Sequence, residues 1–178
     1  SFVNLLIIAL EKITGSFKDA VINSSEILSI KGKVIPSTLE NIDLVAKLQS
    51  GKRIKGERKI YLSGRFDPIR QVWLDKESVL ANPEAIKAII NADIILIGPG
   101  SLWTSIIPNL LIQDITKAII KNKHAKKIFI CNISTERGET QNYSVQDHIN
   151  KLVSYSHKKI IDSVLVNSKV IKTSRTTH

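Results

Sequence analysis

The second half of the chain alternates short apolar runs with polar loops and helices. The apolar runs are Ile94–Ile97, Lys127–Cys131 and Val164–Val166, and helices are expected at Asp114–Asn122 and Val145–Ser154. Short, wholly apolar runs are typical of strands that are buried on both faces of a parallel sheet. The alternation therefore predicts an α/β fold with a parallel, doubly wound sheet and right-handed crossovers.

Capping residues mark three further helices in the region before these strands. Gly favours the left-handed conformation that ends a helix, Ser and Asn accept hydrogen bonds at a helix start, and Pro fits the first helical turn. The expected helices and their caps are Phe2–Thr14 with Gly15, Phe17–Leu28 with Ser16, and Glu84–Asn91 with Asn82 and Pro83.

An antiparallel hairpin is expected between these helices. Residues Ile42–Gln49 alternate apolar and polar side chains, which is the pattern of a half-buried strand. Ser50-Gly51 then forms a turn, and Lys52–Lys59 returns as the second strand. Gly64–Pro68 is expected to be a loop, and Ile69–Leu74 a further strand.

The amino-acid composition excludes several classes of protein. The chain has 178 residues, of which 43% are hydrophobic, so we expect one globular domain over residues 1–178. Cys131 is the only cysteine, which excludes a disulfide scaffold and a zinc site built from several thiolates. A chain without disulfides suits a reducing compartment, and we expect a cytoplasmic protein. No apolar run reaches the length of a membrane-spanning helix, so no membrane partner is expected.

The formal net charge of +10 raises the question of nucleic-acid binding. Basic residues gather at Lys52–Lys59, Lys117–Lys127 and His157–Lys159. No aromatic side chains interleave with these clusters, and the chain has no zinc-finger or RNP-like string. We therefore favour a solvated basic surface, and nucleic-acid binding remains an alternative.

Two polar segments follow predicted strands at the edge where open parallel sheets bind ligands. After Ile94–Ile97, the segment Gly98–Ser105 combines glycines with the hydroxyl groups of Ser101, Thr104 and Ser105, which could bind an anion such as phosphate. It lacks the lysine of a P-loop, and an ordinary strand-to-helix turn explains it equally well. After Lys127–Cys131, the polar segment 132–143 offers Glu139, Thr140 and Tyr143 as hydrogen-bonding groups for a sugar or base, with a solvated loop as the alternative.

The chain carries no recognisable catalytic motif. Asp147 and His148 are adjacent on a predicted helix, where neighbouring residues do not face each other. A Gly-x-Ser-x-Gly elbow and a set of His, Asp or Glu with metal-ligand spacing are both absent from the sequence. We assign Cys131 to the core, and packing is the expected role of Trp103. No catalytic or metal-binding residue is therefore assigned.

Two longer strings carry a family resemblance. Residues Ala92–Leu111 closely resemble the central signature of the YvcK/CofD-like family, and Cys131–His148 resembles its second signature. Shorter matches lie at Asn4–Gly15 and Val34–Glu40. The resemblance runs in the family's order over about Ser1 to Asn167.

The resemblance implies a Rossmann-like three-layer fold with a parallel sheet, an inserted antiparallel hairpin and a nucleotide-type ligand. In the YvcK branch the ligand is a UDP-sugar, and the gluconeogenesis factor regulates carbon metabolism, cell-wall synthesis and cell shape. In the CofD branch the protein is a 2-phospho-L-lactate transferase. Ser-Leu-Trp-Thr-Ser after Gly98-Pro99-Gly100 is more similar to the YvcK branch. We expect a regulator that does not catalyse, and transferase activity remains an alternative.

The implied site residues fall into three groups on this chain. Those expected at a phosphate or nucleotide are Gly98, Pro99, Gly100, Ser101, Thr104, Ser105 and Asn109; those expected at a sugar or base are Asn132, Gly138, Glu139, Thr140 and Tyr143; Asn4 and His148 complete the set.

The family's opening Gly-rich strand–turn–helix and its Asp-Asp-Gly-Gly segment have no counterpart in this sequence. Val3 stands where the family has a glycine, and the end of the chain, Lys169–His178, is polar and unpatterned. A sheet without its first strands has an exposed edge. We therefore expect the chain to pair with the missing segment or to self-associate, and a decayed copy without activity is a further alternative.

Overall fold

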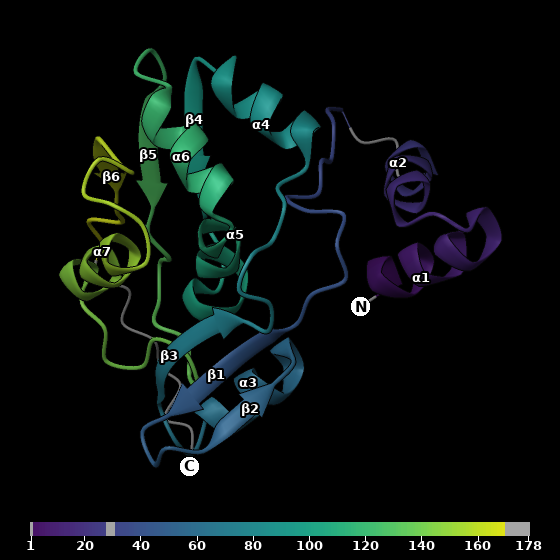
Figure 1. Cartoon of the computed structure of the whole chain (residues 1–178). Helices are drawn as coiled ribbons and strands as arrows, with labels where there is room; N and C mark the ends of the chain where they lie inside the picture. Colours follow the sequence, from purple (N-terminus) through teal and green to yellow (C-terminus); the bar gives the residue numbers. More distant parts are fainter. Residues whose placement is uncertain (1, 28–30, 170–178) are drawn as a thin grey trace.

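The computed structural model describes residues 2–27 and 31–169, which form two three-stranded sheets and the helices around them (Figure 1). The chain is therefore a mixed α/β protein. In chain order its elements are α1 (Phe2–Thr14), α2 (Phe17–Ile27), β1 (Leu44–Leu48), β2 (Arg53–Lys55), α3 (Glu57–Gly64), β3 (Ile69–Leu74), α4 (Pro83–Ile90), β4 (Ile94–Ile97), η1 (Leu102–Ile106), α5 (Ile107–Leu111), α6 (Gln113–Lys121), β5 (Lys126–Ile130), α7 (Val145–Ser154) and β6 (Ser163–Leu165).

The three apolar runs form the predicted parallel sheet. Its strand order is β4-β5-β6, and both strand pairs are parallel. Ile97 of β4 lies beside Phe129 of β5, which in turn lies beside Val164 of β6. Helices α4 and α6 pack against each other, and their side chains reach Ile95 and Ile97 on one face of this sheet.

The prediction that β4 is buried on both faces is wrong. Ile94 and Leu96 of β4 are 61% and 57% exposed, and Leu165 of β6 is 59% exposed. These side chains point away from α4 and α6, because successive residues of a strand face opposite sides of the sheet. Among the described residues, helices cover one face of the parallel sheet, so the expected third layer is not formed by this part of the chain.

The segment between β4 and α6, for which no helix is predicted, is mostly helical. A single π-helical turn, η1, leads directly into α5. Pro108 in the first turn of α5 needs no hydrogen-bond donor there, so the proline is compatible with the helix. The helical turns carry Trp103 and Ile107 into the core, where each is fully buried.

The expected hairpin is part of an antiparallel sheet of strand order β2-β1-β3. Leu44, Ala46 and Leu48 of β1 are buried as the alternation predicts. The return strand is shorter than expected, because Gly56 has a φ of 95° and the chain turns there into helix α3. Helix α3 was not predicted from the sequence.

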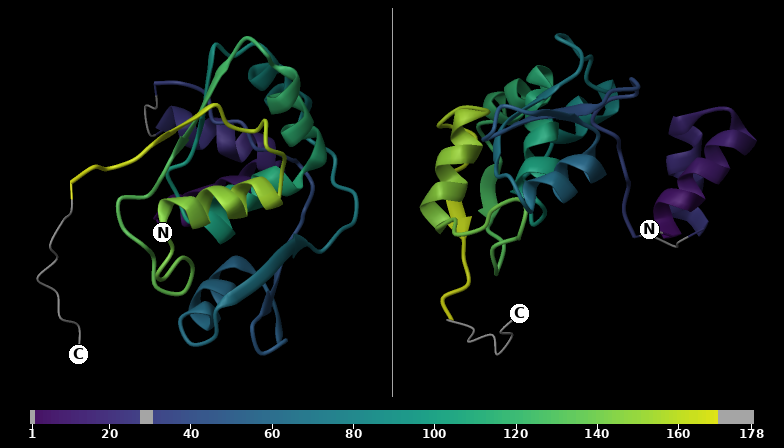
Figure 2. Two further views of the ribbon diagram at one scale, coloured as in Figure 1. Left: turned by 90° about the vertical axis from the view of Figure 1, so that its left-hand side faces the viewer. Right: turned by 90° about the horizontal axis from the view of Figure 1, so that it is seen from below.

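Helices α1 and α2 form a hairpin that stands apart from the two sheets (Figure 2). Gly15, with a φ of 72°, ends α1, and the Ser16 hydroxyl accepts a hydrogen bond of 3.2 Å from the Asp19 N–H at the start of α2, as predicted. Lys18 forms an ion pair of 2.6 Å with Glu84 of α4. Within residues 2–27 and 31–169, none of the helices has the length and apolar character needed to span a membrane.

An aromatic pair joins the two sheets. The buried Trp103 ring packs edge-on against Tyr155 at a centroid distance of 5.8 Å. The Tyr155 hydroxyl accepts a hydrogen bond of 2.9 Å from the Val72 N–H on the outer edge of β3. The turn that follows β4 is therefore held between the parallel and the antiparallel sheet.

Candidate functional site

The carboxyl ends of β4 and β5 bring the two predicted polar segments together. The Asn132 side chain pairs with the Gly100 backbone: Gly100 N–H donates to Asn132 Oδ1 at 3.2 Å, and Asn132 Nδ2 donates to the Gly100 carbonyl at 2.9 Å. Gly98 has a φ of 84°, and a Cβ there would lie 2.9 Å from the Ile130 carbonyl oxygen. Gly98 and Gly100 are therefore adjacent to the end of β5, and the chain forms a tight turn at Gly98.

Glu139 clamps the second segment onto the first. Its carboxylate accepts a hydrogen bond of 3.0 Å from the Trp103 N–H and another from the Thr104 hydroxyl. The Glu139 carbonyl accepts a third, of 3.1 Å, from the Trp103 indole nitrogen. Only 6% of Glu139 is exposed, and this burial raises the pKa of its carboxyl group although the hydrogen bonds from Thr104 and Trp103 oppose the shift.

Glu136, three residues before Glu139, makes a similar contact with the first segment. Its carboxylate accepts a hydrogen bond of 2.7 Å from the Ser101 hydroxyl. The Thr140 side chain, 1% exposed, accepts a bond of 3.0 Å from the Glu136 N–H. The hydroxyl groups that the sequence offers to a phosphate at Ser101 and Thr104 thus have carboxylate partners within the protein, as does the Trp103 N–H between them. An anion that used these donors would have to displace a glutamate.

Gly138 holds the second segment against the end of α3. Its φ is 94°, and a Cβ there would lie 2.7 Å from Arg65 Cγ and 2.9 Å from the Tyr61 carbonyl oxygen. A Cβ on Gly64 would lie 2.0 Å from the Gly138 carbonyl oxygen. This close backbone approach was not expected, because the pattern of residues Lys52–Lys59 predicts a strand where α3 begins.

Tyr143, the last residue of the second segment, packs against His148 of α7. Their rings meet edge-on with centroids 5.5 Å apart, and His148 is 4% exposed. His148 Nδ1 lies 2.8 Å from the Ser144 carbonyl oxygen, and within the described part of the chain Nε2 is buried without a hydrogen-bond partner. Hydrogen bonds from the Ser144 side chain and backbone lower the pKa of Asp147, which closes a capping box at the start of α7. Asp147 and His148 thus serve separate local roles, as their spacing predicts.

The remaining residues of the first segment lie beside the free edge of β4. Asn109 Nδ2 donates a hydrogen bond of 2.8 Å to the Ser105 carbonyl, and its Oδ1 accepts one from the Ser37 hydroxyl. A cavity of about 360 Å³ lies here, with Gly98, Pro99, Ser105 and Asn109 on its lining and isoleucine side chains behind them. The side chain of Asn4 lies outside the described residues.

A second cavity, of about 420 Å³, opens between the two segments. Pro99 lines one side, and Asn132 and Glu136 with the residues between them line the other. The two cavities share Pro99, so the Gly98–Gly100 turn separates them. Among the described residues, no group of three His, Cys, Asp or Glu side chains has metal-binding geometry.

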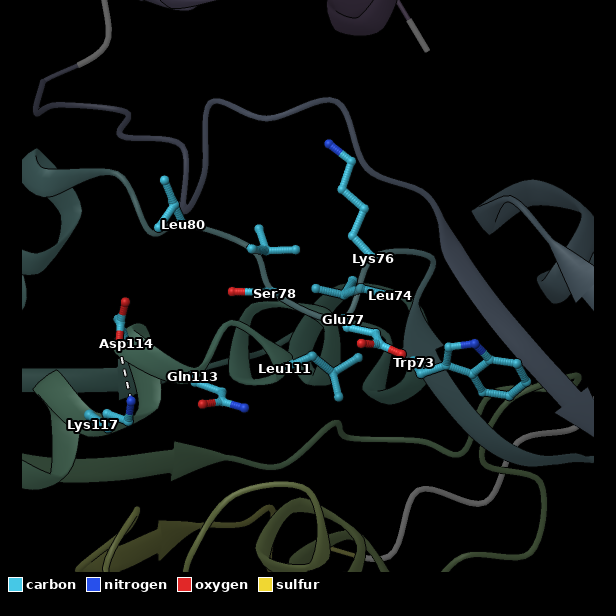
Figure 3. Close-up of a pocket in the computed structure, with 11 residues that line it drawn as sticks. Trp73, Leu74, Lys76, Glu77, Ser78, Leu80, Leu111, Gln113, Asp114 and Lys117 are labelled. Atoms are coloured by element: carbon cyan, nitrogen blue, oxygen red, sulfur yellow. Dashed lines mark hydrogen bonds and ion pairs between the residues drawn. The ribbon is translucent and has the colours of Figure 1, made fainter.

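A third cavity, of about 460 Å³, lies away from these loops, between the segment after β3 and the start of α6 (Figure 3). Three of its charged side chains are in ion pairs: Lys117 with Asp114 at 3.3 Å, and Lys76 with Glu40, outside the cavity lining, at 3.1 Å. This cavity could not be predicted from the sequence, because its walls come from segments about 40 residues apart.

Comparisons with known proteins agree with the resemblance seen in the signatures. The family model described as 2-phospho-L-lactate transferase CofD matches residues 1–178. A gluconeogenesis factor of Bacillus subtilis is 42% identical over 168 residues, which are 94% of this chain and 52% of that protein. A gluconeogenesis factor of Listeria innocua is 39% identical over 168 residues, covering 94% of this chain and 51% of that protein.

A solved structure supports the same fold. A crystal structure of a UPF0052 family member from Bacillus halodurans superposes with a TM-score of 0.86 and 35% identity, over 97% of this chain and 55% of that one. The chain thus spans about half the length, or less, of the curated relatives that it matches.

Proposed function

This chain belongs to the CofD family, and because gluconeogenesis factors are among its relatives we propose that it is part of a UDP-sugar-binding regulator of carbon metabolism, cell-wall synthesis and cell shape. The proposed site is the crevice at the carboxyl ends of β4 and β5. We place the phosphate groups at the Gly98–Gly100 turn and the sugar or base along residues 132–143. We further propose a cytoplasmic location, which suits the buried free thiol of Cys131.

The observation that carries this proposal is the pairing of Asn132 with Gly100 across the two segments. Open parallel sheets bind ligands outside the carboxyl ends of their strands. The Asn132 amide fixes the Gly100 peptide group there, between cavities of about 420 and 360 Å³. Such volumes suit a small organic ligand. A site that is rigid before binding loses less conformational entropy when the ligand arrives.

The buried glutamate supports recognition rather than chemistry. Glu139 accepts three hydrogen bonds through its side chain and carbonyl, all from Trp103 or Thr104. A carboxylate that is buried and fully engaged is not available to abstract a substrate proton. We therefore propose that Glu139, Thr140 and Gly138 shape the crevice and act on the ligand through the Trp103 turn.

Transferase activity is the second candidate, because the matching family model carries that description. Phosphoryl-group transfer depends on positioning and on charge neutralisation around the phosphate. The acidic side chains nearest the turn, Glu136 and Glu139, already accept hydrogen bonds from it. If this chain takes part in such a transfer, we expect the charge-neutralising groups to come from polypeptide outside residues 1–178.

The proposal is tested by calorimetric titration of UDP-glucose, with uridine and glucose as separate controls. Gly98→Ala should abolish binding, because a Cβ there meets the Ile130 carbonyl oxygen at 2.9 Å. Gly51→Ala is the matched control, since Gly51 also has a positive φ, of 91°, but lies in the hairpin turn with open space around it. The absence of heat at millimolar UDP-glucose, for this chain alone and for this chain joined to the unmatched part of the Bacillus subtilis relative, would contradict the proposal.

A further inference from the structure

The outward face of helix α3 carries basic and large apolar side chains together. The inward face of this helix is set by Ile60 and Gly64, which are buried. Five exposed residues recur at the spacing i, i+1, i+4, i+7 and i+8, which places them on the opposite side of the helix: Arg58, Lys59, Leu62, Arg65 and Phe66. We call these five residues the α3 face.

The helical turns continue past the end of α3 as far as Phe66. Arg65 has a φ of −66° and a ψ of −22°, and the N–H groups of Phe66 and Asp67 both donate to the Ser63 carbonyl, at 3.1 and 3.0 Å. Leu62 and Phe66 are therefore neighbours one helical turn apart. Leu62 is 45% exposed, and Phe66, at 87%, is the most exposed large apolar side chain among the described residues.

The segment that contains α3 carries most of the positive charge of the chain. Residues 44–74 hold eight basic and two acidic side chains, so six of the ten net positive charges lie there. Among residues 2–27 and 31–169, no carboxylate forms an ion pair with Arg58, Lys59 or Arg65. The one acidic residue of α3, Glu57, lies in the first turn, where the helix dipole favours a negative charge. The α3 face therefore complements an anionic surface.

The size and shape of the α3 face favour a lipid surface over a protein or a nucleic acid. Helix α3 lies beside β1 and β2 at one end of the molecule (Figure 1), and the Phe66 side chain protrudes from it. A specific protein interface buries about 800 Å² on each partner, which is more than one side of a helix about 12 Å long supplies. Stacking of nucleic-acid bases needs rings, and Leu62 has none. Helices that lie on membranes combine Lys and Arg with Phe and Leu, as this face does.

We propose that the α3 face binds the surface of a membrane that contains anionic phospholipids. Leu62 and Phe66 enter the boundary between the head groups and the acyl chains, and the three basic residues pair with lipid phosphates. The long stems of Lys and Arg let their charged ends stay among the head groups. Helix α3 lies on this membrane and does not cross it, so the proposal agrees with the absence of a membrane-spanning helix from the described residues.

Binding to a membrane also orients the candidate site. Gly64, on the inward face of α3, packs so closely on the second segment that a Cβ there would lie 2.0 Å from the Gly138 carbonyl oxygen. The second segment therefore lies on the other side of α3 from the lipid surface. This orientation matters only if the proposed function holds, whereas the binding of the α3 face to lipid does not rest on it.

Vesicle flotation with the full chain tests the proposal, with vesicles of about one-third phosphatidylglycerol in phosphatidylcholine. We expect the chain to bind these vesicles, to release them as salt is raised, and to leave pure phosphatidylcholine vesicles unbound. Arg58→Gln combined with Lys59→Gln should weaken binding by at least about tenfold, because each basic residue near an anionic membrane is worth about fivefold. Lys121→Gln combined with Lys123→Gln is the matched control, since both lysines are exposed near the end of α6 and the change in net charge is equal.

Phe66 provides the second measurement. Phe66→Ser should weaken vesicle binding by at least about fivefold, because membrane affinity grows with the apolar area buried. Leu80→Ser is the control, since Leu80 is 71% exposed and lies outside the α3 face. In Phe66→Trp, the fluorescence of the new indole should shift to shorter wavelength on the anionic vesicles and be quenched by brominated acyl chains.

Three results would overturn the proposal. The first is equal weakening of vesicle binding by the two charge-reducing pairs, which would mean attraction by net charge alone. The second is an emission spectrum of Phe66→Trp that the anionic vesicles leave unchanged. The third is binding of single-stranded RNA under conditions where the vesicles stay unbound, weakened by the Arg58 and Lys59 changes, which would assign the face to nucleic acid.

Discussion

The carboxylate of Glu139 accepts a hydrogen bond from the Trp103 N–H, and the Glu139 carbonyl accepts one from the Trp103 indole, at 3.0 and 3.1 Å. Both residues are almost completely buried. The two bonds fix the position of the π-helical turn η1 against the segment that follows β5. Since Gly100 also pairs with Asn132, the crevice at the carboxyl edge is held at two points.

Replacing the Glu139 carboxylate should therefore destabilise the fold. Glu139→Ala leaves the buried Trp103 N–H and Thr104 hydroxyl without an acceptor, and each lost partner costs about 1–3 kcal/mol. Glu139→Gln keeps one oxygen acceptor and should cost less than Glu139→Ala. Urea unfolding followed by tryptophan fluorescence measures both variants. Equal stability of Glu139→Ala and the parent chain would contradict the clamp.

The same carboxyl group predicts a pH dependence. Burial raises the pKa of Glu139 above its ordinary value of 4.5, so the folded state holds this proton more tightly than the unfolded state does. The stabilisation is complete below the ordinary pKa and is lost as pH rises through the raised value. The free energy of unfolding of the parent chain, measured relative to Glu139→Gln, should fall with rising pH over that interval. A relative stability that rises with pH there would reverse the sign and refute the assignment.

Gly64 should not tolerate a side chain. A Cβ on Gly64 would stand 2.0 Å from the Gly138 carbonyl oxygen, and backbone cannot move aside as a flexible side chain can. We expect Gly64→Ala to cost about 1–3 kcal/mol, the usual range for overpacking. Leu62→Ala, on the same helix and 45% exposed, is the control and should change stability by less than about 1 kcal/mol. Thermal unfolding of the two variants distinguishes the close approach from a general sensitivity of α3.

Local capping chemistry accounts for the parts of the fold that the sequence predicted well. The caps at Gly15, Ser16 and Asn82 depend on residues within three positions of each helix end, and each is formed as expected. The exposure of Ile94 and Leu96 could not be predicted in the same way. The burial of a strand depends on which other elements cover its faces. An apolar run has the same sequence pattern whether one face or both faces are covered.

The candidate site shows the same division between local and distant information. The Gly98–Ser105 turn was recognisable because its glycines and hydroxyls are neighbours in sequence. The partners of Ser101 and Trp103, Glu136 and Glu139, lie 35 and 36 residues away. A glutamate in a polar loop suggests contact with a ligand when its hydrogen-bond donors lie far away in the sequence and are not known. The ligand roles assigned to the second segment therefore remain predictions.

Glu84 should hold the α1–α2 hairpin at the start of α4 through its ion pair with Lys18. Hydrogen bonds and charge attraction from Lys18 and then Lys33 lower the pKa of Glu84 to about 2. The ion pairs are therefore intact above the ordinary value of 4.5 and are lost as pH falls through about 2. At neutral pH, Glu84→Gln should broaden the distance distribution in small-angle X-ray scattering, as should raising the salt concentration to about 1 M, which screens exposed pairs. Glu77→Gln is the control, because Glu77 is exposed and lies outside these ion pairs.

Tyr155→Phe tests the link between the two sheets. The Tyr155 hydroxyl accepts the hydrogen bond of the Val72 N–H, and Val72 is 1% exposed. Phenylalanine keeps the edge-on contact with Trp103 but leaves this N–H without a partner, which costs about 1–3 kcal/mol. Tyr61→Phe is the control. In native-state hydrogen exchange the Val72 amide should lose protection in Tyr155→Phe and keep it in Tyr61→Phe. Unchanged protection of Val72 in both variants would mean that the Tyr155 hydroxyl does not bind the β3 edge in solution.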